Sequence, residues 1–256
     1  MQSFKSYWNN ENNSRFNYKS LPKSIRGIIV GQSGCGKTAC LIQMLLSPGF
    51  LDYDQLYIYG KSLHQPEYQI LRKCLENKLP KELIIDIFER QGEVERIGID
   101  KVIEDLTKKL KPSDKSDINI ELFEDSDDIP DPKDVPRNHK NLFIFDDILL
   151  EKQTTPEKFY TRGRHNNIDT IYIAQNFHKL PRQTIRANHN LLILFKQPHK
   201  DLRHIFDDLV SNDMNFQEFK DFANQYDDYK YVVIDKTKNI GKYKNGFNEI
   251  YIPQTS

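Results

Sequence analysis

Short runs of apolar residues alternate along the chain with longer stretches in which apolar residues recur every three or four positions. The runs predict buried strands, and the periodic stretches predict helices that pack on a sheet. Strands are predicted at 28–30, 55–59, 141–147, 168–174, 190–196, 229–235 and 249–252. Helices are predicted at 38–46, 64–75, 81–110 (with breaks near Gly92 and Gly98), 156–160, 180–188, 198–210 and 216–226. Strands that alternate with helices favour an α/β fold with a mostly parallel sheet.

The first predicted strand runs directly into a phosphate-binding motif. The octet consists of Gly31, Gln32, Ser33, Gly34, Cys35, Gly36, Lys37 and Thr38, and it fits the P-loop pattern G-x-x-x-x-G-K-T. Its glycines let successive backbone N–H groups turn toward an anion, and the following helix N-terminus adds partial positive charge. Lys37 can reach the β- and γ-phosphates, and the Thr38 hydroxyl can ligate Mg²⁺. The motif predicts that the protein binds a nucleoside triphosphate, and a glycine-rich turn without a nucleotide is the alternative.

Three further polar side chains end predicted strands. Asp146 and Asp147 end the apolar strand at 141–147, and Gln175 follows the strand at 168–174. Asp146 is predicted to hold Mg²⁺ together with Thr38, and Asp147 to polarise the attacking water. Gln175 is predicted to sense the γ-phosphate or to orient water. A helix cap or turn for Asp147 and a simple strand end for Gln175 are the alternatives. Because ligands bind at the carboxyl ends of parallel strands, these side chains are expected beside the P-loop.

Two arginines, Arg162 and Arg164, lie in a glycine-containing loop just before the strand at 168–174. They belong to the amino end of that strand, which on a parallel sheet is the edge opposite the P-loop. Neither is expected to reach its own nucleotide, but a neighbouring subunit could receive one of them as an arginine finger. Arg164, nearer the strand, is the preferred candidate. A solvated basic loop or a pair with a carboxylate is the alternative.

The charge balance limits how the protein could bind nucleic acid. The 256 residues contain 37 Lys and Arg and 37 Asp and Glu, so the net charge is zero. Attraction to DNA would therefore have to be local, along a pore or a stripe. Two basic clusters could contact phosphates, although runs of charge usually form solvated faces. The clusters are Lys179, Arg182 and Arg186, and Lys236, Lys238, Lys242 and Lys244.

The pattern also predicts the organisation and setting of the chain. Residues 1–23 are expected to form an arm and 24–256 the P-loop domain, with a flexible acidic insertion around 112–139 that could instead repel DNA or recruit a basic partner. No apolar run approaches the ~20 residues of a membrane span, and the N-terminus lacks the apolar core of a signal peptide. The three cysteines have no C-x-x-C spacing, so neither a disulfide framework nor a zinc site is expected. A reducing, intracellular setting and no secretion are predicted.

Over residues 24–196 the chain resembles the FtsK/HerA superfamily of P-loop ATPases, specifically the viral genome-packaging ATPases of poxviruses, other large DNA viruses, virophages and polinton-type elements. The matching motifs are GQSGCGKT at 31–38, LFIFDD at 142–147, TRGRHNN at 161–167, IYIAQN at 171–176 and LPRQTIRAN at 180–188. The resemblance implies Arg164 as a finger acting in trans and Gln175 as a sensor, which agrees with the roles above. Asp147 departs from many members, in which a catalytic Glu follows the first Asp.

The same resemblance implies a RecA-like (ASCE) sheet and a homo-oligomeric ring, expected to be a hexamer. It implies ATP-driven translocation of double-stranded DNA, capsid or portal components as partners, and a location in the host cell cytoplasm, a viral factory or the virion.

Two other functions remain open from the residues themselves. A P-loop nucleotide or nucleoside kinase would need an acceptor pocket and usually an Arg-rich lid, whereas the acidic stretch has few arginines, with Arg137 at its end. A nucleotide-switched binding protein of the GTPase type would need N-K-x-D after a strand. The nearest match, at 166–169, lacks the lysine and precedes its strand. The DNA-translocating motor is the favoured hypothesis.

Overall fold

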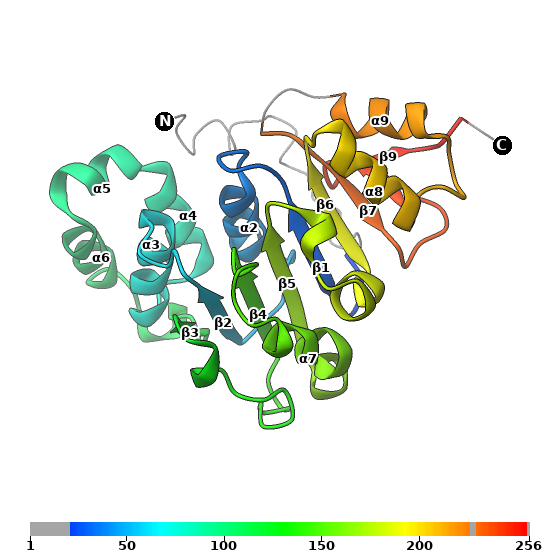
Figure 1. Cartoon of the computed structure of the whole chain (residues 1–256). Coiled ribbons are helices and arrows are strands. Elements are labelled where there is room, and N and C mark those ends of the chain that lie inside the picture. Colours follow the sequence, from blue (N-terminus) through cyan, green and yellow to red (C-terminus); the bar gives the residue numbers. More distant parts are fainter. Residues whose placement is uncertain (1–20, 226–228, 255–256) are drawn as a thin grey trace.

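One nine-stranded sheet organises the computed structural model, which describes residues 21–225 and 229–254 (Figure 1). The strand order is β3-β2-β4-β5-β1-β6-β7-β8-β9. From β3 to β6 in this order all neighbours are parallel, and from β6 to β9 they are antiparallel. The strands are β1 Arg26–Val30, β2 Gln55–Gly60, β3 Asn119–Phe123, β4 Asn141–Asp146, β5 Ile168–Ala174, β6 Leu191–Phe195, β7 Tyr231–Asp235, β8 Tyr243–Asn245 and β9 Glu249–Tyr251.

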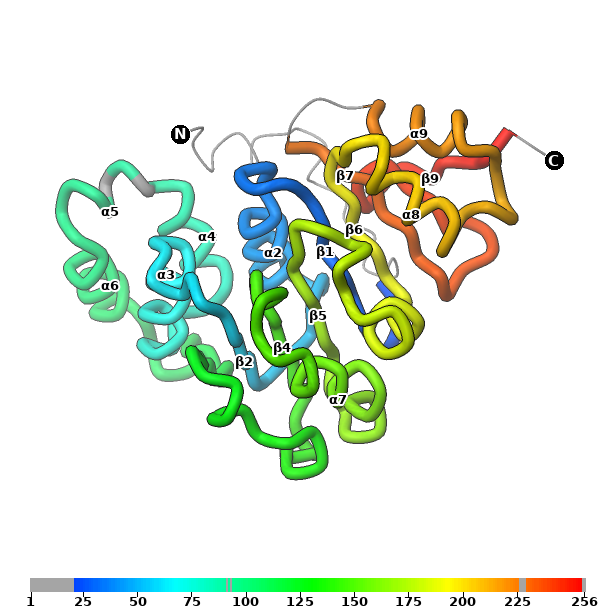
Figure 2. The backbone as a smooth tube through the Cα atoms, viewed as in Figure 1, coloured from blue at the N-terminus to red at the C-terminus, as the bar shows by residue number. Residues whose placement is uncertain are grey.

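Helices cover both faces of the sheet. One face carries α2 Lys37–Leu46, α3 Pro66–Glu76, α4 Lys81–Glu89, α5 Gln91–Ile97 and α6 Ile99–Thr107. The other face carries α7 Thr154–Arg162, α8 His199–Leu209 and α9 Phe216–Asn224. Figure 2 shows α5 and α6 at one end of the sheet, beyond β2, and α8 and α9 at the other, near β6 and β7. The predicted α/β class, a mostly parallel sheet flanked by helices, is therefore confirmed.

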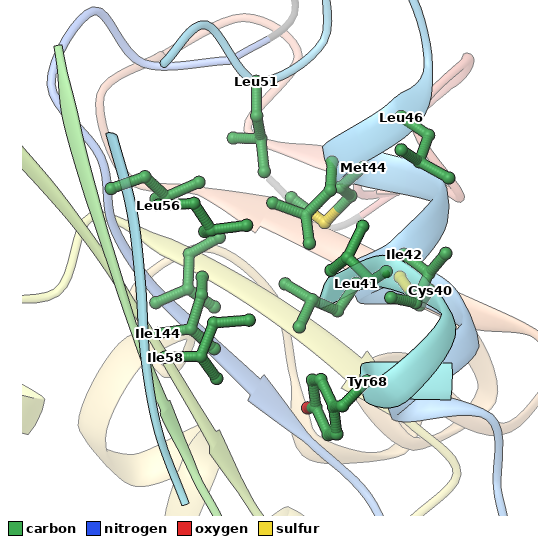
Figure 3. Packing of buried hydrophobic residues seen from close by; sticks show 14 of the residues in the cluster. Cys40, Leu41, Ile42, Met44, Leu46, Leu51, Leu56, Ile58, Tyr68 and Ile144 are labelled. Carbon is green, nitrogen blue, oxygen red and sulfur yellow. The ribbon is translucent and has the colours of Figure 1, made fainter. Parts of the chain in front are cut away.

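Alternation along the strands divides the core into two clusters of different character. In β4, Ile144 belongs to the cluster under α2 and α3, whereas Phe143 and Phe145 belong to the cluster under α7 and α8. This follows from the two-residue repeat of a strand, which points successive side chains to opposite faces. Figure 3 shows part of the first cluster, where Leu41 of α2 packs toward Ile58 and Ile144. The faces are largely aliphatic on one side and rich in aromatic rings on the other.

Two strands were not predicted from the hydrophobic pattern. β3 lies inside the acidic stretch, for which only a flexible insertion was expected, and its side chains are exposed or half-buried. β8 overlaps the end of the basic segment at 236–244 and includes Lys244. Both pair near or at an edge of the sheet, where one strand face need not be apolar. Their polar composition therefore hid them from a search for apolar runs.

The region at 81–110, for which a broken helix was predicted, forms three helices. Its breaks fall at Arg90 and Gly98, and Gly92 lies inside α5. At 180–188, where a helical turn or short helix was predicted, the chain forms a π-helical turn, Arg182–Arg186. Of the predicted N-terminal arm, residues 1–20 lie outside the described residues. Among the helices of residues 21–225 and 229–254, none combines the length and apolar character that crossing a bilayer requires.

Candidate nucleotide-binding site

The P-loop connects the carboxyl end of β1 to the first turn of α2, as the motif predicted. Gly34 and Gly36 adopt left-handed φ angles of 76° and 99°, which residues with a Cβ rarely adopt. At Gly31 the restriction is packing: a Cβ there would lie 2.7 Å from Cβ of Phe195 on β6 and 2.4 Å from Sγ of Cys35. Glycine is thus required at Gly31 by a neighbouring strand and at the other two positions by the turn.

Lys37 folds back over its own loop. Its Nζ donates hydrogen bonds to the carbonyl oxygens of Gly31 and Gln32, each at 2.8 Å. An ammonium has three donors, so Nζ can retain a loop carbonyl while donating to a phosphate oxygen. The loop residues from Gln32 to Gly34 are exposed, so an anion can reach their backbone from solvent.

The strand order brings the other predicted residues to the P-loop. β5 lies between β1 and β4, with Val30 opposite Ala174 and Ile173 opposite Asp146. All three strands are parallel, so the residues that follow them emerge at the same edge. Gln175 consequently sits between the P-loop and the two carboxylates. Its Nε2 donates to Oδ2 of Asp147 at 3.0 Å.

Asp146 and Asp147 differ sharply in environment. Asp146 is 7% exposed, and burial raises the pKa of its carboxyl, while a hydrogen bond from Tyr68 lowers it. Asp147 is exposed, has a left-handed φ of 51°, and its N–H donates to the carbonyl of Ile173 at 3.1 Å. The left-handed conformation is tolerated by Asp and directs the chain away from the strand.

The donors at this edge fit a hard divalent cation. Magnesium prefers oxygen ligands, and in P-loop proteins it is held by the loop hydroxyl and a carboxylate together with phosphates and water. Thr38 and Asp146 supply the hydroxyl and the carboxylate. Within the described part of the chain, Asp146 forms no ion pair, although a buried carboxylate normally has a cationic partner or a metal. Thr38 and Asp146 are therefore the residues that would hold Mg²⁺.

Arg162 and Arg164 lie at the opposite edge of the sheet. Arg162 ends α7, and Arg164 belongs to the short helical turn Gly163–Asn166 that precedes β5. Both are exposed, and neither side chain forms a hydrogen bond or ion pair with the described residues. Arg164 lies near Arg26, at the start of β1, whose pKa is lowered by burial first and then by this neighbouring charge. The predicted separation of Arg164 from its own P-loop is observed.

The two basic clusters are partly paired with carboxylates. Arg186 donates to Asp208 at 2.6 Å, and Lys242 donates to Asp213. Lys244 is buried, and burial lowers its pKa to about 8. Part of each cluster is therefore not available to bind phosphates.

Tyr68 is a contact of the site that the sequence analysis missed. Its hydroxyl donates to Oδ2 of Asp146 at 2.5 Å, across 78 positions of sequence. In the sequence it fits the apolar stripe of α3, and no local signal distinguishes it from a core residue. Only the packing of α3 against the ends of α2 and β4 reveals the contact.

The P-loop after β1, together with a strand inserted between β1 and the carboxylate-bearing β4, defines the fold as that of a RecA-like P-loop NTPase. No protein-family model and no curated protein matches the sequence.

Solved structures match in fold. The genome packaging NTPase B204 from Sulfolobus turreted icosahedral virus 2, in complex with sulfate, aligns over 91% of this chain and 100% of its own, with 12% identity and a TM-score of 0.51. VirB4 of Thermoanaerobacter pseudethanolicus aligns over 83% and 87%, with 13% identity and a TM-score of 0.47. At 12% identity the likeness to B204 is one of fold.

Proposed function

We propose that this protein is an ATP-hydrolysing motor that translocates double-stranded DNA, and that it packages a viral genome into a capsid. The observation that carries the proposal is the convergence of the P-loop, Asp146, Asp147 and Gln175 at one sheet edge, while Arg164 lies at the other. The fold shared with a viral genome packaging NTPase supports the same activity.

Nucleotide binding would begin at the P-loop. The exposed backbone N–H groups of the loop and Nζ of Lys37 bind the triphosphate, and the N-terminus of α2 favours its charge. Thr38 and Asp146 hold Mg²⁺, which when bound neutralises charge that develops on the phosphates during transfer.

Hydrolysis would use the hydrogen-bonded pair formed by Gln175 and Asp147. Gln175 orients a water toward the γ-phosphorus. Asp147 accepts a proton from that water as the water oxygen attacks the phosphorus. The bond from the γ-phosphorus to the bridging oxygen breaks, and ADP leaves with phosphate. Because Asp147 is exposed here, the water would be enclosed only when another surface covers this edge.

That surface would belong to the next subunit of a homo-oligomeric ring. Arg164 of one subunit would stabilise the transferring phosphate at the P-loop of its neighbour, which ties hydrolysis to assembly. A ring needs cationic residues only along its pore, so zero net charge is compatible with a DNA motor. Capsid or portal components are the proposed partners at the site of assembly.

The proposal is tested by an ATPase assay with and without double-stranded DNA. The protein should hydrolyse ATP faster when DNA is present, and Lys37→Ala should lower the rate by about 10²–10³-fold because it removes a phosphate donor. Lys73→Ala is a matched control, since Lys73 is on α3 and pairs with Asp100. Its rate should equal that of the unsubstituted protein.

Two results would contradict the proposal. A rate of ATP hydrolysis that DNA does not change would contradict a DNA-translocating motor. Transfer of phosphate to a small acceptor would indicate a kinase. Either result would leave the P-loop assignment in place.

A further inference from the structure

A single buried hydroxyl contacts Asp146, one of the two residues that would hold Mg²⁺. Tyr68, in the first turn of α3, has no exposed surface, and its Oη donates to Oδ2 of Asp146 at 2.5 Å. Burial and then Asp146 raise the pKa of this phenol, and the neighbouring Thr38 side chain partly offsets the rise.

The direction of this hydrogen bond is defined by the chemistry of the two groups. The neutral phenol has one proton to donate, and it goes to the carboxylate of Asp146.

The surroundings of Tyr68 hold this hydroxyl in place. Pro66 begins α3, so the ring projects from the first helical turn. The ring belongs to the core cluster of Leu41 and Ile144, and Figure 3 shows it beside the lower end of α2 with its oxygen turned toward the strands. A side chain packed in this way has one orientation. Its hydroxyl therefore restricts the orientation of the carboxylate that accepts its hydrogen bond.

Asp146 depends on this contact because other partners are absent. Over residues 21–225 and 229–254, Tyr68 is the side chain that hydrogen-bonds to the Asp146 carboxylate, and no cation pairs with it. Lys37 lowers the pKa of Asp146 only by longer-range attraction and donates to its own loop. Without Tyr68, the carboxylate could rotate freely about its side-chain bonds.

We propose that Tyr68 is a positioning residue that orients the Asp146 carboxylate for Mg²⁺. The proposal rests on the proposed function, since it requires a nucleotide–metal complex at this edge. Residues that orient metal ligands act without touching the metal, and their loss typically lowers metal affinity or activity by about 10–100-fold. Through Tyr68, helix α3, which lies outside the P-loop, contacts the proposed metal site.

The test is direct metal binding, with Mn²⁺ as the probe. Free Mn²⁺ is measured by electron paramagnetic resonance in the presence of protein and a non-hydrolysable ATP analogue. Tyr68→Phe should weaken Mn²⁺ binding about tenfold. Affinity for the analogue without metal, measured in EDTA, should stay unchanged, because the hydrogen bond of the phenol goes to Asp146 and not to the phosphate-binding backbone.

Tyr53→Phe is the matched control. Tyr53 is buried in the same core cluster and also donates one hydrogen bond, to the carbonyl of Leu45 at 3.0 Å. Its substitution removes an equally buried hydroxyl away from the P-loop. Tyr53→Phe should lower thermal stability as Tyr68→Phe does but leave Mn²⁺ affinity as it was. If Tyr68→Phe does not fold, Tyr68→Met removes the same hydroxyl with a flexible side chain and has the same expectation.

A double-mutant cycle tests whether Tyr68 acts through Asp146. Asp146→Asn alone and combined with Tyr68→Phe should bind Mn²⁺ equally weakly, because the phenol then has no carboxylate to orient. Additive losses would overturn the proposal, as would a Tyr68→Phe variant that binds Mn²⁺ as tightly as Tyr53→Phe. If the unsubstituted protein itself binds neither the analogue nor Mn²⁺, the proposed function is contradicted, and this inference falls with it.

Discussion

The two edges of the parallel sheet differ in how their polar groups are satisfied. At the carboxyl edge, the polar side chains bond within the site: Lys37 to its loop, Gln175 to Asp147, and Tyr68 to Asp146. At the amino edge, Arg164 is exposed, and its side chain has no hydrogen bond or ion pair within the described residues. The carboxyl edge is preorganised by contacts within the chain, whereas the amino edge presents a cation that the described residues leave unpaired. This difference is what a site divided between subunits requires.

The largest expected effect concerns the amino edge. Arg164→Ala should lower kcat by about 10³-fold, because an arginine finger contributes at least that much to phosphoryl transfer. ATP affinity should not change, since Arg164 lies far from its own P-loop. Steady-state hydrolysis and equilibrium nucleotide binding measure the two quantities. Arg162→Ala, two residues away at the end of α7, is the control. It should lower kcat by less than roughly tenfold if Arg164 is the finger.

Mixed rings distinguish action in trans. Arg164→Ala subunits retain an intact P-loop, and Lys37→Ala subunits retain an intact finger. Mixing the two should restore part of the hydrolysis that each lacks alone. Mixed assembly without any recovery would refute the division of the site between subunits.

At the carboxyl edge, Asp147→Asn should lower kcat by about 10²-fold, the lower range for loss of a general base. Gln175→Ala should have a similar effect, and the double variant should be little worse than either, because the two side chains act as a hydrogen-bonded pair. Single-turnover hydrolysis is the measurement, with Asn176→Ala as the neighbouring control. Full activity of Asp147→Asn would exclude Asp147 as the base.

The close packing at the carboxyl edge predicts a change in stability. Gly31→Ala should lower the free energy of unfolding by about 1–3 kcal/mol, as overpacked sites do, because its Cβ would press on Phe195. Gly92→Ala is the contrast: apart from its own helix and chain neighbours, no atom of the described residues lies within 4 Å of its Cβ position, and Gly92 is inside α5. That variant should be more stable by up to about 1 kcal/mol. Urea unfolding compares the two, and equal effects would contradict the packing argument.

The smallest expected effect is a pH dependence at the amino edge. Burial raises the pKa of Asp169 to about 6, although the N–H of Ile25 donates to its Oδ1 at 2.8 Å. A carboxyl with a raised folded-state pKa favours the fold below its unfolded pKa, and this contribution is lost as pH rises through about 6. Asp169→Asn should therefore stabilise the protein by about 1 kcal/mol at pH 7.5 and not at pH 3.5. Urea unfolding at both pH values checks this, and a gain independent of pH would contradict it.

Much of the fold and part of the site followed from local sequence. The P-loop is eight consecutive residues between an apolar run and a periodic one, so neighbours along the chain suffice to define it. The same holds for Asp146 and Asp147, which end an apolar strand. The strands β3 and β8 have mixed polarity and were not predicted, because their pairing partners and not their own pattern hold them in the sheet.

Tertiary structure decided which of these elements meet. The insertion of β5 between β1 and β4 places Gln175 against Asp147, and no pattern within a segment specifies the order of strands in a sheet. Phe195, 164 positions away in the sequence, leaves no room for a side chain at Gly31. Tyr68 hydrogen-bonds to Asp146, 78 positions away. The sequence by itself determined the chemistry available at the P-loop. The packing of distant segments determined which side chains orient that chemistry, because such contacts depend on the whole sheet and its helices.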